Sequence, residues 1–158
     1  MPQMIRSSRP PLSLKARALQ WLANREHSRF ELRAKLLRAA GDAHTADVDA
    51  LLDQLALQGH MSDARFVESR LHARSARFGN RRIEHELRQH GVAIDAATQA
   101  QLRATELARA HQVWCKRFGV LAQDAAGRAR QARFLAARGF SAEVVHKVVS
   151  ADHEIESI

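Results

Sequence analysis

The sequence predicts an all-α protein made of three tandem three-helix repeats that form an elongated, curved helical array. Good helix formers such as Ala, Leu and Arg dominate the 158 residues, whereas Tyr is absent and Pro occurs only three times. Apolar residues recur at helical spacing in most of the chain. Glycines follow these helix-like runs, as C-terminal caps do: Gly41, Gly59, Gly79, Gly91, Gly119 and Gly139.

The spacing of the glycines indicates an internal repeat. The segments 37–41, 87–91 and 135–139 each begin with Leu and end with Gly, and their glycines lie 50 and then 48 residues apart. A single unit of ~45 residues would be marginally stable alone, so neighbouring units should pack end to end. The expected organisation is a flexible N-terminal tail at 1–12, repeats at 13–59, 60–105 and 106–153, and a C-terminal tail at 154–158.

Each element of the first repeat has a local signal. The first helix is expected over residues 13–25. Ser28 and Glu31 form a capping box that opens the second helix. Thr45 is expected to cap the third helix. The clearest amphipathic stripe of the chain follows, and it consists of Val48, Leu51, Leu52 and Leu55.

The same pattern continues through the other two repeats. Ser62 is expected to cap a helix that reaches about Phe78, Asn80 a short helix, and Asp95 the next one. In the third repeat, an apolar stripe from Leu107 ends at Gly119. The last two helices are expected over 128–138 and 141–149.

The charge balance favours a polyanionic partner. The net charge is +8, and 21 of the 25 basic residues are Arg. An alternative explanation is that Arg richness reflects the base composition of the genome. Residues 1–40 carry +7, 41–60 carry −4, 61–100 carry +2 and 101–158 carry +3. This uneven spread excludes a uniform basic tail that coats DNA.

Other features argue against an enzyme, a secreted protein and a membrane protein. Cys115 is the only cysteine, so no intramolecular disulfide forms, as expected in a reducing compartment. No secretory signal and no apolar run of ~20 residues is present, which predicts a cytoplasmic location. His111 and Cys115 share a helix face, but a structural zinc site needs four ligands. The sequence contains no nucleotide-binding or hydrolase motif, so we expect no catalysis, metal or cofactor.

Several motifs together resemble the RecX family. The first is Ser28-x-x-Glu31-Leu32-x-x-Lys35-Leu36. The second is Ser62-Asp63-Ala64-Arg65-Phe66-Val67, then Arg74, then Gly79-x-x-Arg82-Ile83-x-x-Glu86-Leu87-x-x-x-Gly91. The third is Arg133-Phe134-Leu135-x-x-Arg138-Gly139-Phe140. The match covers residues 14–150. Ser62 stands where the family often has an acidic residue, and Asn80 replaces a Pro or small residue.

The resemblance implies three tandem three-helix repeats and a non-catalytic modulator, usually an inhibitor, of the RecA recombinase. Such proteins bind in the groove of the filament that RecA forms on single-stranded DNA. They suppress strand exchange, coprotease function and ATP hydrolysis by RecA. The implied partners are RecA, as monomer or filament, and single-stranded DNA, with double-stranded DNA left open. The protein itself is expected to be a monomer.

Two groups of arginines are candidate contacts with the filament or DNA. Arg70, Arg74 and Arg77 share one face of the fourth predicted helix, and Arg81 and Arg82 follow Gly79. They could bind phosphates, or they could form a solvated face paired with Glu68, Glu84 and Glu86. The second group lies near helix starts, where free N–H groups attract anions. It contains Arg29, Arg81, Arg82, Arg128 and Arg130.

The aromatic residues are expected to be core residues, with Phe78 the one candidate for base stacking. Two other functions stay open on the sequence alone. Three-helix units resemble helix-turn-helix repressors, although the third predicted helix is acidic. A helical-repeat scaffold for protein partners is the other alternative, which the basic charge makes less natural.

Overall fold

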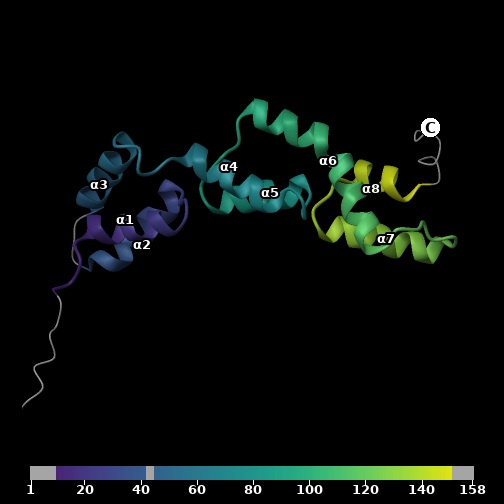
Figure 1. The fold of residues 1–158 in the computed structure, drawn as a ribbon, viewed down its shortest axis with the longest axis horizontal. Coiled ribbons are helices and arrows are strands. Elements are labelled where there is room, and N and C mark those ends of the chain that lie inside the picture. The colour runs from purple at the N-terminus through teal and green to yellow at the C-terminus, as the bar shows by residue number, and fades with distance from the viewer. Residues whose placement is uncertain (1–9, 42–44, 151–158) are drawn as a thin grey trace, which may run out of the picture. The chain divides into compact units, whose positions relative to one another are not determined.

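The computed structural model describes residues 10–41 and 45–150 (Figure 1). Within these ranges the chain forms eight α-helices and no strand, so the predicted all-α class is confirmed. The predicted tails lie outside the described residues, apart from residues 10–12. The helices are α1 (Leu14–Asn24), α2 (Arg29–Ala40), α3 (Thr45–Leu57), α4 (Asp63–Arg74), α5 (Asn80–Gln89), α6 (Ala96–Arg117), α7 (Ala125–Ala137) and α8 (Ala142–Val149).

The chain divides into two compact units, residues 1–62 and 63–158, and each is described by itself. The first unit contains α1, α2 and α3, and α2 packs against both of the others. Ser28 caps α2 through its side chain, as predicted, and Ser13 caps α1 in the same way. The core of this unit consists of Ala18, Leu32, Leu36, Val48, Leu52, Leu55 and Met61.

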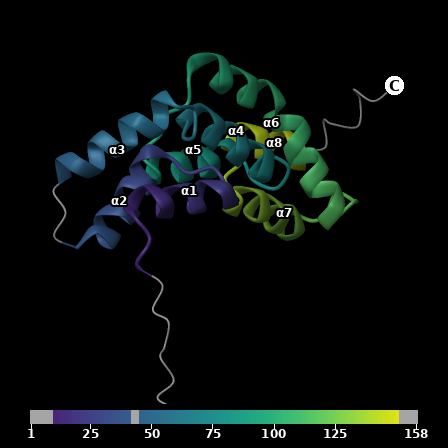
Figure 2. The same ribbon diagram turned by 60° about the vertical axis from the view of Figure 1, so that its left-hand side comes forward.

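The second unit contains α4 to α8 and has two apolar clusters. The cluster around Phe66, Ile83 and Leu87 joins α4 to α5. The other cluster joins the second half of α6 to α7 and α8, with Trp114 and Leu135 among its buried members. Helix α8 packs against both α6 and α7 (Figure 2).

The prediction of nine separate helices is wrong at one point. Helix α6 runs without interruption over 22 residues, where two helices were expected. No Gly or Pro occurs between residues 96 and 117, so nothing in the backbone stops the helix. The expected boundary between residues 105 and 106 therefore falls inside α6, which supplies the last helix of one repeat and the first of the next.

Four other local predictions need correction. Five of the six predicted closing glycines have positive φ, but Gly79 has φ −79° and is the N-cap of α5. Asn80, predicted as that cap, is the first residue of α5, just as Thr45 is the first residue of α3. Helix α7 begins earlier than predicted because Asp124 caps it, with its carboxylate accepting from the Gly127 N–H.

Candidate functional site

The start of α5 lies directly against the turn between α7 and α8. The Gly79 N–H donates to the Arg138 carbonyl at 2.9 Å, and the Arg81 N–H donates to the Gly139 carbonyl at 3.1 Å. A Cβ on Gly79 would lie 2.2 Å from the Phe140 nitrogen, so only glycine fits here. Two segments about 60 residues apart in the sequence are thereby joined through their backbones.

Glu106 of α6 holds the same junction from inside. Its side chain is buried, and Oε1 accepts from the N–H groups of Asn80 at 3.1 Å and Ser141 at 3.2 Å. One carboxylate thus satisfies the N-termini of both α5 and α8. A negative charge is favourable at both helix starts because each helix dipole is positive there.

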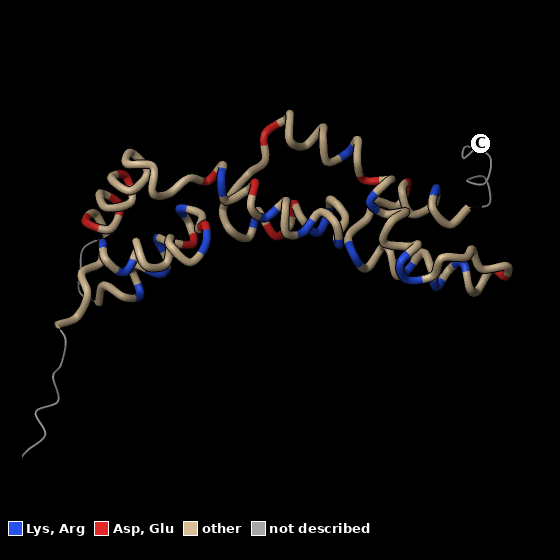
Figure 3. The backbone as a smooth tube through the Cα atoms, viewed as in Figure 1, with Lys and Arg blue, Asp and Glu red and all other residues tan. Residues whose placement is uncertain are grey.

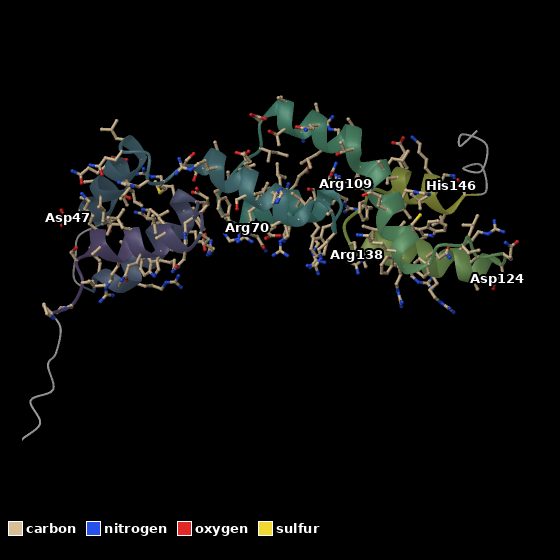
Figure 4. All side chains as sticks on the ribbon, in the orientation of Figure 1. Asp47, Arg70, Arg109, Asp124, Arg138 and His146 are labelled. Atoms are coloured by element: carbon tan, nitrogen blue, oxygen red, sulfur yellow. The ribbon has the colours of Figure 1, made fainter. Side chains whose placement is uncertain are left out.

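Arg109, one turn further along α6, completes the junction (Figure 4). Its guanidinium donates to the carbonyls of Ser75 at 3.0 Å and Phe78 at 2.9 Å, and also to Asn80 Oδ1. Burial lowers the pKa of Arg109, and the Glu106 carboxylate opposes that shift. The segment between α4 and α5 is therefore held by hydrogen bonds from a residue of α6.

Three of the predicted arginines surround the ring of Phe78. The guanidinium carbons of Arg74, Arg77 and Arg82 lie 5.6, 5.6 and 4.1 Å from the ring centroid. Phe78 itself is 8% exposed, so its ring is a support for the arginines and has no open face for a base.

The predicted pairing of arginines with carboxylates holds for two of them. Glu86 Oε1 lies 3.0 Å from Arg70 and 3.3 Å from Arg74. Both arginines are half-buried, and Arg70 also lies over the ring of Phe66. Their charge is therefore partly neutralised within the second unit.

Arg77, Arg81 and Arg82 instead line two basic hollows on either side of the Arg138–Gly139 turn. The first hollow, of about 260 Å³, is lined by Ala76, Arg77, Val113, Lys116, Arg117, Phe134 and Arg138. The second, of about 550 Å³, is lined by Arg81, Arg82, Glu84, His85, Arg88, Ala136, Ala137 and Gly139. Figure 3 shows Lys and Arg along α5 and at the adjoining ends of α6 and α7.

The arginines predicted near other helix starts have different surroundings. Arg29 donates to Asp53 Oδ1 at 2.7 Å, which ties α2 to the acidic helix α3. Arg128 donates to the carbonyls of Ala122 at 3.1 Å and Gln123 at 2.9 Å, in the loop before α7. Arg130 is exposed on α7. Both Arg29 and Arg128 are thus engaged inside their own unit.

Sequence reasoning missed Lys116, Arg117 and Arg138 as members of a basic hollow. A signal was present, since each lies in the last turn or at the end of a helix, where cations are favoured. It also missed Glu106 and Arg109, whose partners lie 26 to 35 residues away.

Features of a metal, thiol or membrane site are sparse among the described residues. No cluster of three or more His, Cys, Asp or Glu side chains suited to a metal occurs among the described residues. Cys115 is exposed, with Sγ 3.6 Å from His111 Nδ1. Over residues 10–41 and 45–150, the helices are too short or too polar to cross a membrane.

Comparison with known proteins assigns the family. Family models described as the second and third three-helix domains of RecX match residues 62–100 and 104–149. The regulatory protein RecX of Leptothrix cholodnii is 52% identical over 151 residues, which cover 94% of this chain and 95% of that protein. That of Herminiimonas arsenicoxydans is 50% identical over 147 residues, covering 92% and 96%.

A solved structure has the same fold. The crystal structure of RecX from Lactobacillus salivarius superposes with a TM-score of 0.71 at 17% identity, over 92% of this chain and 96% of that chain. The predicted tandem three-helix repeats are confirmed by this likeness and by the two family models. With relatives this similar over nearly its whole length, the chain belongs to the RecX family of regulatory proteins.

Proposed function

We propose that this protein binds the filament of RecA recombinase on DNA and lowers the ATPase, strand-exchange and coprotease activities of RecA. It acts by binding rather than by catalysis, needs no cofactor, and works as a monomer in the cytoplasm. Its partners are RecA, free or in the filament, and single-stranded DNA, with duplex DNA bound more weakly.

The observation that carries the proposal is the pair of basic hollows in the second unit of a RecX-family chain. Seven Lys and Arg side chains line them, against one carboxylate, that of Glu84. An uncompensated positive surface attracts a nucleic-acid backbone through phosphate contacts and the release of counterions. A surface of this kind suits a nucleoprotein polymer better than a neutral protein partner.

The predicted contact residues differ in how well their surroundings support this role. Arg77, Arg81 and Arg82 line the hollows and have no ion pair within the described part of the chain. Arg130 is exposed on α7 and is proposed as a contact with the filament or DNA outside the hollows. Four others, Arg29, Arg70, Arg74 and Arg128, hold contacts inside the protein and would have to exchange them for phosphates.

The test is a titration of this protein into RecA on poly(dT), with ATP hydrolysis as the readout. We expect a saturable fall in the hydrolysis rate. The Arg81→Glu, Arg82→Glu double variant should require a several-fold higher concentration, since it reverses two charges in a hollow. An unchanged RecA rate with the wild-type protein would contradict the proposal.

A matched control is available in Lys15 and Arg103, which are exposed on α1 and α6 and line neither hollow. Replacing both with Glu makes the same change in net charge, and the RecA titration should stay as in the wild type. A repressor would instead prefer one duplex sequence by ~10³ or more. A protein scaffold would show no salt-dependent DNA binding.

A further inference from the structure

We infer that the hollow lined by Arg77, Lys116, Arg117 and Arg138 is a binding site for the backbone phosphates of single-stranded nucleic acid. It is called the α6–α7 hollow below. The inference deepens the proposed function and rests on it for its biological setting. Of the four cations, only Arg77 was among the arginines singled out from the sequence.

The α6–α7 hollow has no internal counter-charge. None of its lining residues is Asp or Glu, and none of its four cations forms an ion pair with another described residue. Elsewhere in the protein, arginines such as Arg33 and Arg70 are paired with carboxylates at 2.7 and 3.0 Å. A concave site lined by four cations and by no carboxylate therefore concentrates positive charge.

Helix geometry explains how four like charges come together. Lys116 and Arg117 end α6, Arg138 is the C-cap of α7, and Arg77 follows the end of α4. Each helix C-terminus carries about half a negative charge. The partial negative charges of these ends favour the cations without cancelling their full charges, so a net positive charge faces the solvent.

Aromatic rings hold three of the guanidinium groups in place. Arg77 lies 5.6 Å from the centroid of Phe78, Arg117 5.8 Å from that of Phe118, and Arg138 4.6 Å from that of Phe134. The rings of Phe118 and Phe134 pack edge to face at 5.2 Å, so these supports are themselves fixed. Pre-ordered arginines lose less side-chain entropy when they bind, and the planar fork of Arg matches a phosphate group.

The neighbouring hollow favours a polymer over an isolated anion. Arg81, Arg82 and Arg88 line it just beyond Gly139, on the other side of the turn that carries Arg138. A polymer with one charge at each unit can place successive phosphates in both hollows. Arg forks bind carboxylates as well as phosphates in pairs of hydrogen bonds, so competition with poly-Glu in the experiment below separates an acidic peptide from a nucleic acid.

The concave shape favours a single strand over a duplex. A hollow of about 260 Å³ receives a phosphate with part of its sugar. A flexible single strand can bend into such a site, whereas duplex DNA is stiff over ~150 base pairs and presents its phosphates on a convex rod. The slope of log affinity against log salt concentration is also smaller for single strands, about 0.7 per phosphate contact against 0.9 for duplex DNA, so the measured slope distinguishes the two.

The experiment measures binding of a fluorescent dT oligonucleotide to the full chain, without RecA, over a range of salt concentrations. The Lys116→Ala, Arg117→Ala variant should bind roughly tenfold more weakly. The slope of log affinity against log salt should fall by about 1.4, which is two contacts at ~0.7 each. The control is Lys15→Ala, Arg103→Ala, which also removes one Lys and one Arg and should leave both values unchanged.

Circular dichroism melting of each variant verifies that its fold is intact, and Arg138→Ala serves as a second test of the same hollow. If the Lys116→Ala, Arg117→Ala variant and the Lys15→Ala, Arg103→Ala control weaken dT binding equally, the α6–α7 hollow is not the site. Displacement of the labelled dT by poly-Glu at a lower concentration of charges than unlabelled dT requires would also overturn the inference. The proposed function is tested separately, because it fails if the wild-type protein binds dT yet leaves RecA hydrolysis unchanged.

Discussion

Both carboxylate oxygens of Glu106 reach Ser141: Oε1 lies 3.2 Å from its backbone nitrogen and Oε2 lies 3.2 Å from its hydroxyl oxygen. Since Oε1 also accepts from the Asn80 N–H, this one side chain is an anchor for the N-termini of two helices. The basic hollows lie around the same junction, so their geometry depends on it. The stability of that junction can be tested residue by residue.

Replacing Glu106 with Ala should lower the free energy of unfolding by about 2–3 kcal/mol, because two helix N-termini lose their acceptor in a buried place. Chemical denaturation followed by circular dichroism measures this loss. Glu143→Ala is the control, since Glu143 is exposed and its one ion pair among the described residues is with Lys147. Equal stability of the two variants would show that the Glu106 contacts do not hold the junction.

Replacing Gly79 with Ala should destabilise the second unit by more than about 3 kcal/mol. The added Cβ would lie 2.2 to 2.4 Å from backbone atoms of Gly139 and Phe140, which cannot move without breaking the turn. Gly59→Ala is a useful comparison, because Gly59 has φ +76° and open space around it. That substitution should cost only about 1 kcal/mol from backbone strain. A Gly79 variant no less stable than the Gly59 variant would contradict the close contact.

Replacing Gln131 with Leu should cost about 1–3 kcal/mol, because the substitution leaves a buried N–H without an acceptor. Gln131 Oε1 accepts from Trp114 Nε1 at 3.2 Å, and Gln131 Nε2 donates to the Val120 carbonyl at 2.9 Å. Tryptophan fluorescence during urea unfolding measures the change. In the matched variant Gln112→Leu, on the exposed surface of α6, unfolding should be unaffected.

Acid should weaken the first unit through His27. Its ring is buried, with Nδ1 3.0 Å from the Arg25 carbonyl oxygen and Nε2 3.1 Å from Lys35 Nζ. Burial lowers the pKa of His27 below its usual 6.5, and the nearby charges of Arg25 and Lys35 act in the same direction. The unfolded chain therefore binds the proton more readily, and stability falls as the pH drops through 6.5.

Melting temperatures recorded between pH 8 and pH 5 test this prediction. The His27→Gln variant should lose this part of the pH dependence, whereas His60→Gln should keep it because His60 is exposed. A wild-type protein that is as stable at pH 5 as at pH 8 would rule out the burial of a neutral His27.

The parts of the fold that sequence could predict are those with local causes. Ser13, Ser28 and Ser141 begin helices because a side-chain oxygen three residues before a free N–H is a short-range signal. The repeat pattern failed at Gly79, because its distance to Phe140 is set by tertiary packing and leaves no trace in the residues around it. The continuity of α6 was not predicted, because the repeat pattern implied a new helix at the start of the third repeat.

The candidate site was predictable only in part, for the same reason. Arg77, Arg81 and Arg82 stand close together in the sequence, so their grouping was visible. Lys116 and Arg138 join Arg77 only because three helix ends meet. Glu106 and Arg109 resemble an ordinary exposed pair one helical turn apart, and nothing near them indicates a partner on α5 or α8.

Because α6 is uninterrupted, the second and third repeats share a helix and neither can be removed without cutting it. Its 22 residues form a rod about 33 Å long, and cutting it at residue 105 would separate Glu106 and Arg109 from Ser75, Phe78 and Asn80, their partners between α4 and the start of α5. Hydrogen exchange should therefore report one cooperative opening event for α4 to α8. The natural place to divide this protein, for truncation or for exchange of parts with a relative, is near residue 62.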